Sequence, residues 1–299
     1  MNVAVVDVGS NTFRLLVATR GPDGLACIAH GKRVVGLGAA IEREGSIPAA
    51  KLAEAAECMT GFADIARASG AALIDAVVAS PGRQARNADQ LVHMLARAAG
   101  VPVRILSPEE EARLAFEGAL AFTNARSAVA VCDIGGGSTQ IAIGTAEHGP
   151  AWLRSVDLGS LRLCARVGYS DPPAKKEFSA VRVQARRAFG KLTPPLPKEA
   201  VAVGGTARAV KKLVGRTLGA EELRGAARLL RKSTVGQIAA EHGIELWRAQ
   251  ALPAGVAILL EVQRLLGVPL EVGRGGLREG LALELLERLA VAYPVSGGR

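Results

Sequence analysis

The chain has 299 residues, a length that suggests two domains of about 150 residues each. Apolar residues make up 49% and charged residues 22%, which supplies enough apolar material for two cores and excludes a disordered chain. Lysine and arginine outnumber aspartate and glutamate by 37 to 28, so the formal net charge is +9. Aromatic residues are only 3%, too few for a base-stacking platform for single-stranded nucleic acid.

The chain carries four cysteines and no pair at metal-ligand spacing. Free thiols in a chain of this length are typical of a reducing compartment, so we expect a cytoplasmic protein. The first residues have no basic segment before an apolar run, which disfavours a signal peptide. No uninterrupted apolar stretch reaches about 18 residues, so we expect no membrane-spanning helix and no membrane partner.

Strand-like and helix-like segments alternate along the chain, which predicts an α/β protein. In the first half the pattern predicts strands over 3–7, 13–19, 25–35, 73–79 and 103–106, with helices over 48–68, 87–99 and 108–122. The second half begins with strands over 128–133, 138–144 and 151–157 and then becomes mainly helical, with short strands at 201–203 and 270–272. A last helix over 277–290 carries its apolar residues on one face: Leu281, Leu285, Leu286 and Leu289.

An internal repeat is the most informative feature. Residues 3–18 (VAVVDVGSNTFRLLVA) align without a gap with residues 129–144 (VAVCDIGGGSTQIAIG), so that Asp7 falls on Asp133, Gly9 on Gly135 and Thr12 on Ser138. Shared turn chemistry alone would not match the flanking strands, so we predict two similar domains that each open with a β-hairpin. Backbone N–H groups and hydroxyls in such turns suit phosphate oxygens, and the aspartates suit a divalent cation that bridges to phosphate.

The motifs resemble those of the exopolyphosphatase and guanosine pentaphosphate phosphohydrolase family, within the actin, sugar-kinase and heat-shock-ATPase superfamily. They occur in order along almost the whole chain: DVGSNTFR at 7–14, RQARN at 83–87, EEAR at 110–113, DIGGGST at 133–139, LGSLRL at 158–163, GGT at 204–206, LPAG at 252–255 and GLREG at 276–280. The resemblance implies the short, two-domain form of that family.

This resemblance implies two actin-like (ribonuclease H-like) α/β domains with an interdomain cleft. We expect domain I over 1–122, with the C-terminal helix 281–299 packing back onto it, and domain II over 123–280. The implied activity is metal-dependent removal of the terminal phosphate from inorganic polyphosphate, with conversion of guanosine pentaphosphate to tetraphosphate second. Mg²⁺ or another divalent cation is the implied cofactor.

The catalytic base is expected among Glu109, Glu110 and Glu111, at the start of a helix. Glu110 is placed to form a capping box with Ser107, and the helix dipole alone accounts for Glu109. Glu111 has no such duty, and the resemblance places the catalytic glutamate directly before Ala-Arg, so we assign Glu111 as base and Asp133 as the residue that orients water or metal.

The expected phosphate-binding residues are those of the glycine-rich loops and one arginine. They are Asp7, Gly9, Ser10, Asn11, Thr12, Arg14, Arg83, Gly135, Gly136, Gly137, Ser138, Gly204, Gly205 and Thr206. The expected metal ligands are Asp7, Asp133 and Gln140. Two basic helical segments, at 175–191 and 208–232, are read equally well as solvated faces or as a positive field for a polyanion.

Gln140 is a departure, because the family commonly has glutamate at this place. A neutral amide is a poorer metal ligand than a carboxylate, which keeps a second function open: a catalytically weak sensor that binds polyphosphate or an alarmone. An actin-like small-molecule kinase is a third reading. No motif indicates a specific nucleic-acid partner, and a homodimer stays open.

Overall fold

A computed structural model describes residues 1–21, 24–125 and 127–293. The chain divides into two compact units, and each consists of one twisted sheet with helices on both faces. Unit 1 comprises Met1–Ser107 and Leu277–Arg299, and unit 2 comprises Pro108–Gly276. The predicted α/β architecture of two units is therefore confirmed.

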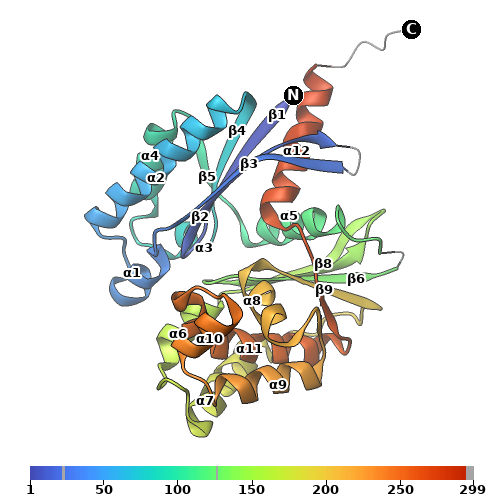
Figure 1. The fold of residues 1–299 in the computed structure, drawn as a ribbon. Coiled ribbons are helices and arrows are strands. Elements are labelled where there is room, and N and C mark those ends of the chain that lie inside the picture. The colour runs from blue at the N-terminus through green and yellow to red at the C-terminus, as the bar shows by residue number, and fades with distance from the viewer. Residues whose placement is uncertain (22–23, 126, 294–299) are drawn as a thin grey trace. The chain divides into compact units, whose positions relative to one another are not determined.

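Unit 1 is built on a five-stranded sheet in the order β3-β2-β1-β4-β5. Its strands are β1 (Asn2–Val8), β2 (Thr12–Gly21), β3 (Gly24–Val34), β4 (Ala71–Val78) and β5 (Val103–Ile105), and its helices are α1 (Leu37–Glu44), α2 (Ala49–Ala68), α3 (Ser80–Gln84), α4 (Ala88–Ala99) and α12 (Leu277–Ala292). Helices α2 and α4 cover one face of the sheet and α12 packs on β1 and β2 from the other face (Figure 1).

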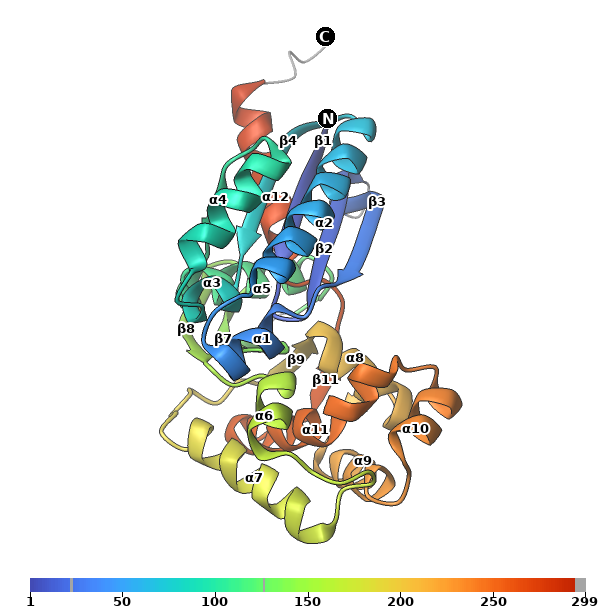
Figure 2. The same ribbon diagram turned by 90° about the vertical axis from the view of Figure 1, so that its left-hand side faces the viewer.

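Unit 2 is built on a six-stranded sheet in the order β10-β11-β9-β6-β7-β8. Its strands are β6 (Val129–Ile134), β7 (Thr139–Thr145), β8 (Gly149–Val156), β9 (Glu199–Val203), β10 (Thr217–Leu218) and β11 (Leu270–Val272), and its helices are α5 (Pro108–Leu120), α6 (Ser160–Val167), α7 (Lys175–Phe189), α8 (Gly204–Val214), α9 (Ala220–Leu230), α10 (Val235–His242) and α11 (Leu246–Leu266). Helix α11 contacts α6, α7, α8, α9 and α10, and Figure 2 shows this helical layer.

The two sheets share one topology, which bears out the internal repeat. In unit 1 an antiparallel meander of β1, β2 and β3 is extended by β4 and β5, which run parallel to β1. In unit 2 a meander of β6, β7 and β8 is extended in the same way by β9 and β11. The two Asp-Gly turns therefore occupy equivalent places, each after the central strand of its sheet.

The last helix of each repeat belongs to the other unit. Helix α5 follows β5 in the chain but packs on β6, β7 and β8, and α12 follows β11 but packs on β1 and β2. The unit boundary therefore lies at 107/108 and not near 122 as predicted from the sequence, because α5 buries its apolar face against the second sheet. The part of the expected C-terminal helix over 294–299 lies outside the described residues.

The core of unit 2 contains one helix with unusual composition. Among the described residues, α11 alone is long and apolar enough to cross a membrane, yet 72% of its most apolar window is buried in the unit, as in the core helix of a water-soluble protein.

All four cysteines are unpaired thiols. Burial raises the pKa of the Cys132 thiol and that of Cys58, the latter to about 11.

Candidate functional site

Hydrogen bonds within the turn between β6 and β7, and hydrogen bonds from helix α6, hold this turn in place. Within the turn, the Gly135 N–H donates to the Ser138 carbonyl at 3.1 Å. From outside, the first N–H groups of α6 donate to its carbonyls: Ser160 to Gly135 and Leu161 to Gly136, both at 3.0 Å. The loop thereby uses its carbonyl groups to satisfy the start of a helix, where N–H groups lack partners within the helix.

The direction of the remaining N–H groups follows from peptide geometry. In a trans peptide the carbonyl and the following N–H point in opposite directions, and these peptides are trans. Because the carbonyls of Gly135 and Gly136 point at α6, the N–H groups of Gly136 and Gly137 point away from it. Among the described residues, neither N–H donates to a protein acceptor. Two adjacent unpaired N–H groups form a concave donor site that suits a phosphate oxygen.

The turn between β1 and β2 repeats this design. The Gly9 N–H donates to the Thr12 carbonyl at 3.2 Å, as Gly135 does to Ser138. The Gly38 N–H donates to Ser10 O at 2.6 Å, so the N–H of Asn11 points the opposite way. The Asn11 side-chain Nδ2 is buried and has no partner among the described residues. Unit 1 therefore holds a second donor loop of the predicted kind.

Asp133 closes β6 beside the start of α8. It lies directly opposite Val203 on the parallel neighbour β9, and Gly204 follows at the first position of α8. Gly204 has φ +86°, and a side chain there would collide with Oδ1 of Asp133. Only glycine fits both the backbone conformation and the space. The fold thus keeps the Asp133 carboxylate against the N-terminal end of a helix, where negative charge is favoured.

Three polar residues form a row across the meander of unit 2. Gln140 on β7 lies directly opposite Asp133 on β6 and Ser155 on β8. Directly opposite residues share a face of the sheet, and side chains alternate along a strand. Val131 and Ala142, two residues away from Asp133 and Gln140, pack against Phe116 of α5. The row therefore lies on the face that α5 covers.

Glu111 belongs to the stripe of α5 that faces this row. It lies one turn before Ala115 and two turns before Ala119, and both of these are buried. The later residues Phe116 and Ala119 of α5 pack with Val129 and Val131 in the first half of β6, so the two elements run in opposite directions. Their lengths are similar, so the first turn of α5 is level with the end of β6, where Asp133 lies. Glu109 is exposed, whereas Glu111 is only 8% exposed, and the role of Glu111 as the base stays a prediction.

Other expected site residues take supporting positions. The Thr206 hydroxyl donates to Ser160 Oγ at 3.1 Å, and the Ser160 hydroxyl donates to Gly135 O at 3.3 Å, which ties α8, α6 and the loop together. In unit 1, Arg83 Nη1 donates to the Leu106 carbonyl at 2.8 Å. Asp7 and Arg14 lie directly opposite each other on β1 and β2.

The expected metal ligands are divided between the units: Asp133 and Gln140 belong to unit 2, and Asp7 belongs to unit 1. Within 1–21, 24–125 and 127–293, no three His, Cys, Asp or Glu side chains come together at metal-binding distance. Gln140 presents its amide nitrogen to Ser138 Oγ and Ser155 Oγ, at 3.0 Å each. Asp133 is the carboxylate of the row, and Mg²⁺ is commonly held by one or two carboxylates together with waters and substrate phosphates. The donor set fits an ion that arrives with phosphate.

Ser155, Ser160 and Arg248 were not selected from the sequence. Ser155 lies in no motif, and Ser160 lies in the LGSLRL motif without an expected site role; their partners lie 15 to 46 residues away. The Arg248 guanidinium stacks on the Trp247 ring, 4.3 Å from its centroid, and lies against Gly205 at the start of α8. No motif marks Arg248, because its place depends on how α11 packs against α8.

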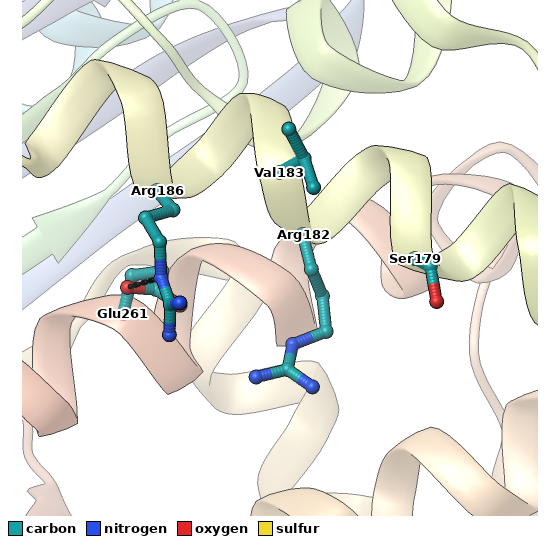
Figure 3. A pocket seen from close by; sticks show the side chains of 5 residues that line it. All are labelled: Ser179, Arg182, Val183, Arg186 and Glu261. Carbon is teal, nitrogen blue, oxygen red and sulfur yellow. Dashed lines mark ion pairs between the residues drawn. The ribbon is translucent and has the colours of Figure 1, made fainter.

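The basic helix α7 has its own partners. It borders a pocket of about 220 Å³ lined by Ser179, Arg182, Val183, Arg186 and Glu261. Glu261 is buried, and its Oε2 lies 3.6 Å from Arg186 Nε and 2.9 Å from Arg264 Nε. Figure 3 shows Arg186 paired with Glu261, while Arg182 points away from this pair. Arg186 therefore serves the core of unit 2 by neutralising a buried carboxylate.

Comparison with known proteins identifies the family and similar folds. Residues 16–289 match the model of the Ppx/GppA phosphatase family. The family member from Aquifex aeolicus has 23% identity and a TM-score of 0.83, covering 97% of this chain and 98% of its own. An exopolyphosphatase from Cytophaga hutchinsonii has 21% identity and a TM-score of 0.83, covering 96% and 98%. An exopolyphosphatase-like protein has 23% identity and a TM-score of 0.86, covering 96% and 98%. The chain belongs to the Ppx/GppA phosphatase family.

Proposed function

We propose that the chain is an exopolyphosphatase that removes the terminal phosphate from inorganic polyphosphate. The observation that carries this proposal is the pair of outward N–H groups of Gly136 and Gly137. They lie beside the polar row of Asp133, Gln140 and Ser155, and the helix that contains Glu111 covers this row. Donors that are fixed before the substrate binds can stabilise the negative charge of a phosphoryl group in transfer. Family membership supports the same reaction class.

The proposed reaction is direct hydrolysis by water. The water oxygen attacks the terminal phosphorus while the Glu111 carboxylate accepts one of its protons. The bond between that phosphorus and the bridging oxygen breaks, and the bridging oxygen stays on the shortened chain. The loop N–H groups and Ser138 hold the oxygens of the transferred group. The products are inorganic phosphate and a chain shorter by one unit, with no covalent intermediate on the protein.

Divalent metal is proposed to bind at Asp133. When bound, Mg²⁺ would neutralise charge on the phosphate oxygens. Gln140 contributes no negative charge there, and its nitrogen is already directed at two hydroxyls. Asp7 stays the predicted metal ligand of unit 1.

A phosphate-release assay tests the proposed function. Purified protein is incubated with long-chain polyphosphate or with guanosine pentaphosphate, in the presence and absence of Mg²⁺, and free phosphate and chain length are measured together. We expect phosphate release from polyphosphate with chains that shorten stepwise from the end. Transfer of phosphate to an added acceptor without release would instead indicate a kinase.

The second candidate is a sensor that binds polyphosphate or an alarmone with little turnover. The hydrogen bonds of Gln140 favour it, because the position offers an amide hydrogen where a carboxylate would assist a metal ion. Saturable binding of polyphosphate without phosphate release, at every divalent metal tested, would establish the sensor in place of the hydrolase.

A further inference from the structure

Gln140 is buried in the middle of the polar row, with only 3% of its surface exposed. Its Nε2 donates one hydrogen to Ser138 Oγ and one to Ser155 Oγ, at 3.0 Å each. Ser155 is its cross-strand neighbour on β8, and Ser138 lies two residues earlier, on the same face of the sheet. Both hydrogens of the amide are therefore used on hydroxyl oxygens.

These contacts fix what the two hydroxyls can do. A serine hydroxyl has one hydrogen and two lone pairs. Each serine here accepts a hydrogen from Gln140, so its own hydrogen is left for another acceptor. Within the described part of the chain, neither hydroxyl donates to a protein acceptor. Ser138 is 3% exposed, and a buried donor without an acceptor is costly.

Ser138 belongs to the same turn as the two outward N–H groups. The backbone of Gly136 and Gly137 contributes two donors, and the Ser138 hydroxyl adds a third. Neither the turn nor the Gln140 amide adds a negative charge to that of Asp133, which lies directly opposite Gln140 on β6. Such a donor group binds an oxyanion with hydrogen bonds alone.

We propose that Gln140 is a positioning residue that keeps the Ser138 hydroxyl a donor, so that the loop at 135–138 binds the terminal phosphate without a metal ion. A carboxylate at this position would accept the hydrogens of Ser138 and Ser155. Ser138 would then turn its hydrogen away from the ligand, and the added charge would repel phosphate unless a cation stood between them. The inference rests on the proposed function, and it assigns metal-independent binding to that same site.

The test measures binding of inorganic tripolyphosphate by calorimetry in excess EDTA. The variants are Gln140→Glu, Ser138→Ala and the combination of the two, with Gln184→Glu on the exposed face of α7 as the charge-matched control. We expect the wild type and the control to bind. Gln140→Glu and Ser138→Ala should each bind at least about tenfold more weakly, and the combination no more weakly than Gln140→Glu alone, because both changes remove the same donor.

Addition of Mg²⁺ separates the two single variants. It should restore binding to Gln140→Glu, whose new carboxylate can hold the cation, and should leave Ser138→Ala weak. Far-UV circular dichroism and melting temperature establish that each variant is folded; should Gln140→Glu fail to fold, Ser138→Ala carries the test. Wild-type binding that needs Mg²⁺, or unchanged affinity of Ser138→Ala in EDTA, overturns the inference.

The outcomes for binding and for hydrolysis are distinguishable. Binding in EDTA without phosphate release in Mg²⁺ overturns the proposed hydrolase and leaves the role of Gln140 intact. Phosphate release in Mg²⁺ without any binding in EDTA supports the proposed hydrolase and overturns the role of Gln140.

Discussion

Gly204 is the residue on which the position of the Asp133 carboxylate depends most directly. Its φ of +86° is unfavourable for any residue with a side chain, and the space a Cβ would need is taken by Asp133 Oδ1 and the Ile134 carbonyl. The residue after β9 is thus determined by the residue at the end of β6, although 71 positions separate them in the chain.

We expect Gly204→Ala to lower the free energy of unfolding by about 1–3 kcal/mol and to reduce phosphate release, because the backbone is strained and the carboxylate displaced. The control is Gly225→Ala in α9, where the new methyl would meet its nearest atom at 3.8 Å, Nη2 of Arg228. That change should stabilise by about 0.5–1 kcal/mol, as alanine does inside a helix. Chemical denaturation measures both. Equal stability of the two variants would contradict this account of Gly204.

The sequence indicated the polar residues of the loops but not the contacts between them. Asp7, Asp133 and the glycines after them could be found because the repeat preserves residue types at fixed spacing. The collision of Gly204 with Asp133, and the amide hydrogens of Gln140 on two serines, arise from strand register and packing between distant segments. No local pattern encodes such contacts.

At the scale of elements, a titratable carboxylate stabilises the start of α7. The Glu177 carboxylate accepts hydrogen bonds from the Ser170 hydroxyl at 2.6 Å and from the Ala174 N–H at 2.7 Å. The Ser170 hydrogen bond is the main cause of a pKa below the ordinary value of 4.5, with the Ala174 N–H second. A lowered folded pKa means that the ionised form stabilises the helix start at neutral pH and that this stability is lost as the pH falls through that pKa.

We therefore expect Glu177→Gln to melt at a lower temperature than the wild type at pH 7, with the difference narrowing as the pH is lowered below 4.5. Thermal melts over a series of buffers measure it. Glu241→Gln on α10, which removes an exposed carboxylate, is the control and should show a smaller and flatter difference. A difference in melting temperature between Glu177→Gln and the wild type that stays constant with pH would refute the role of the ionised carboxylate.

Helices and strands with a strong hydrophobic periodicity were predicted from the sequence, and short elements were missed. The leucine stripe of the last helix is buried as expected, with Leu281, Leu285, Leu286 and Leu289 at most 4% exposed. Helix α1, helix α3 and strand β10 were not expected from the sequence. Residues 81 and 82 of α3 are Pro-Gly, which read as a turn, and β10 has two residues. The assignment of α5 to unit 2 depends on which sheet its apolar face meets, which chain order does not reveal.

For the molecule as a whole, duplication explains the repeated loops and the shared sheet order. The basic surplus is explained only where contacts identify a partner, as for Arg186 and Arg264 on the buried Glu261 carboxylate. We propose that unit 2 combines an anion-binding loop with Glu111 as the base for hydrolysis.

Steady-state phosphate release from polyphosphate by Glu111→Gln measures the contribution of this base, with Glu109→Gln on the same helix turn as control. Removing a base costs about 10²–10⁴-fold in rate. We predict a fall of that size in kcat for Glu111→Gln with KM changed less than about threefold, and wild-type kinetics for Glu109→Gln, whose side chain is exposed. A Glu111→Gln variant that releases phosphate at the wild-type rate would show that Glu111 is not the base.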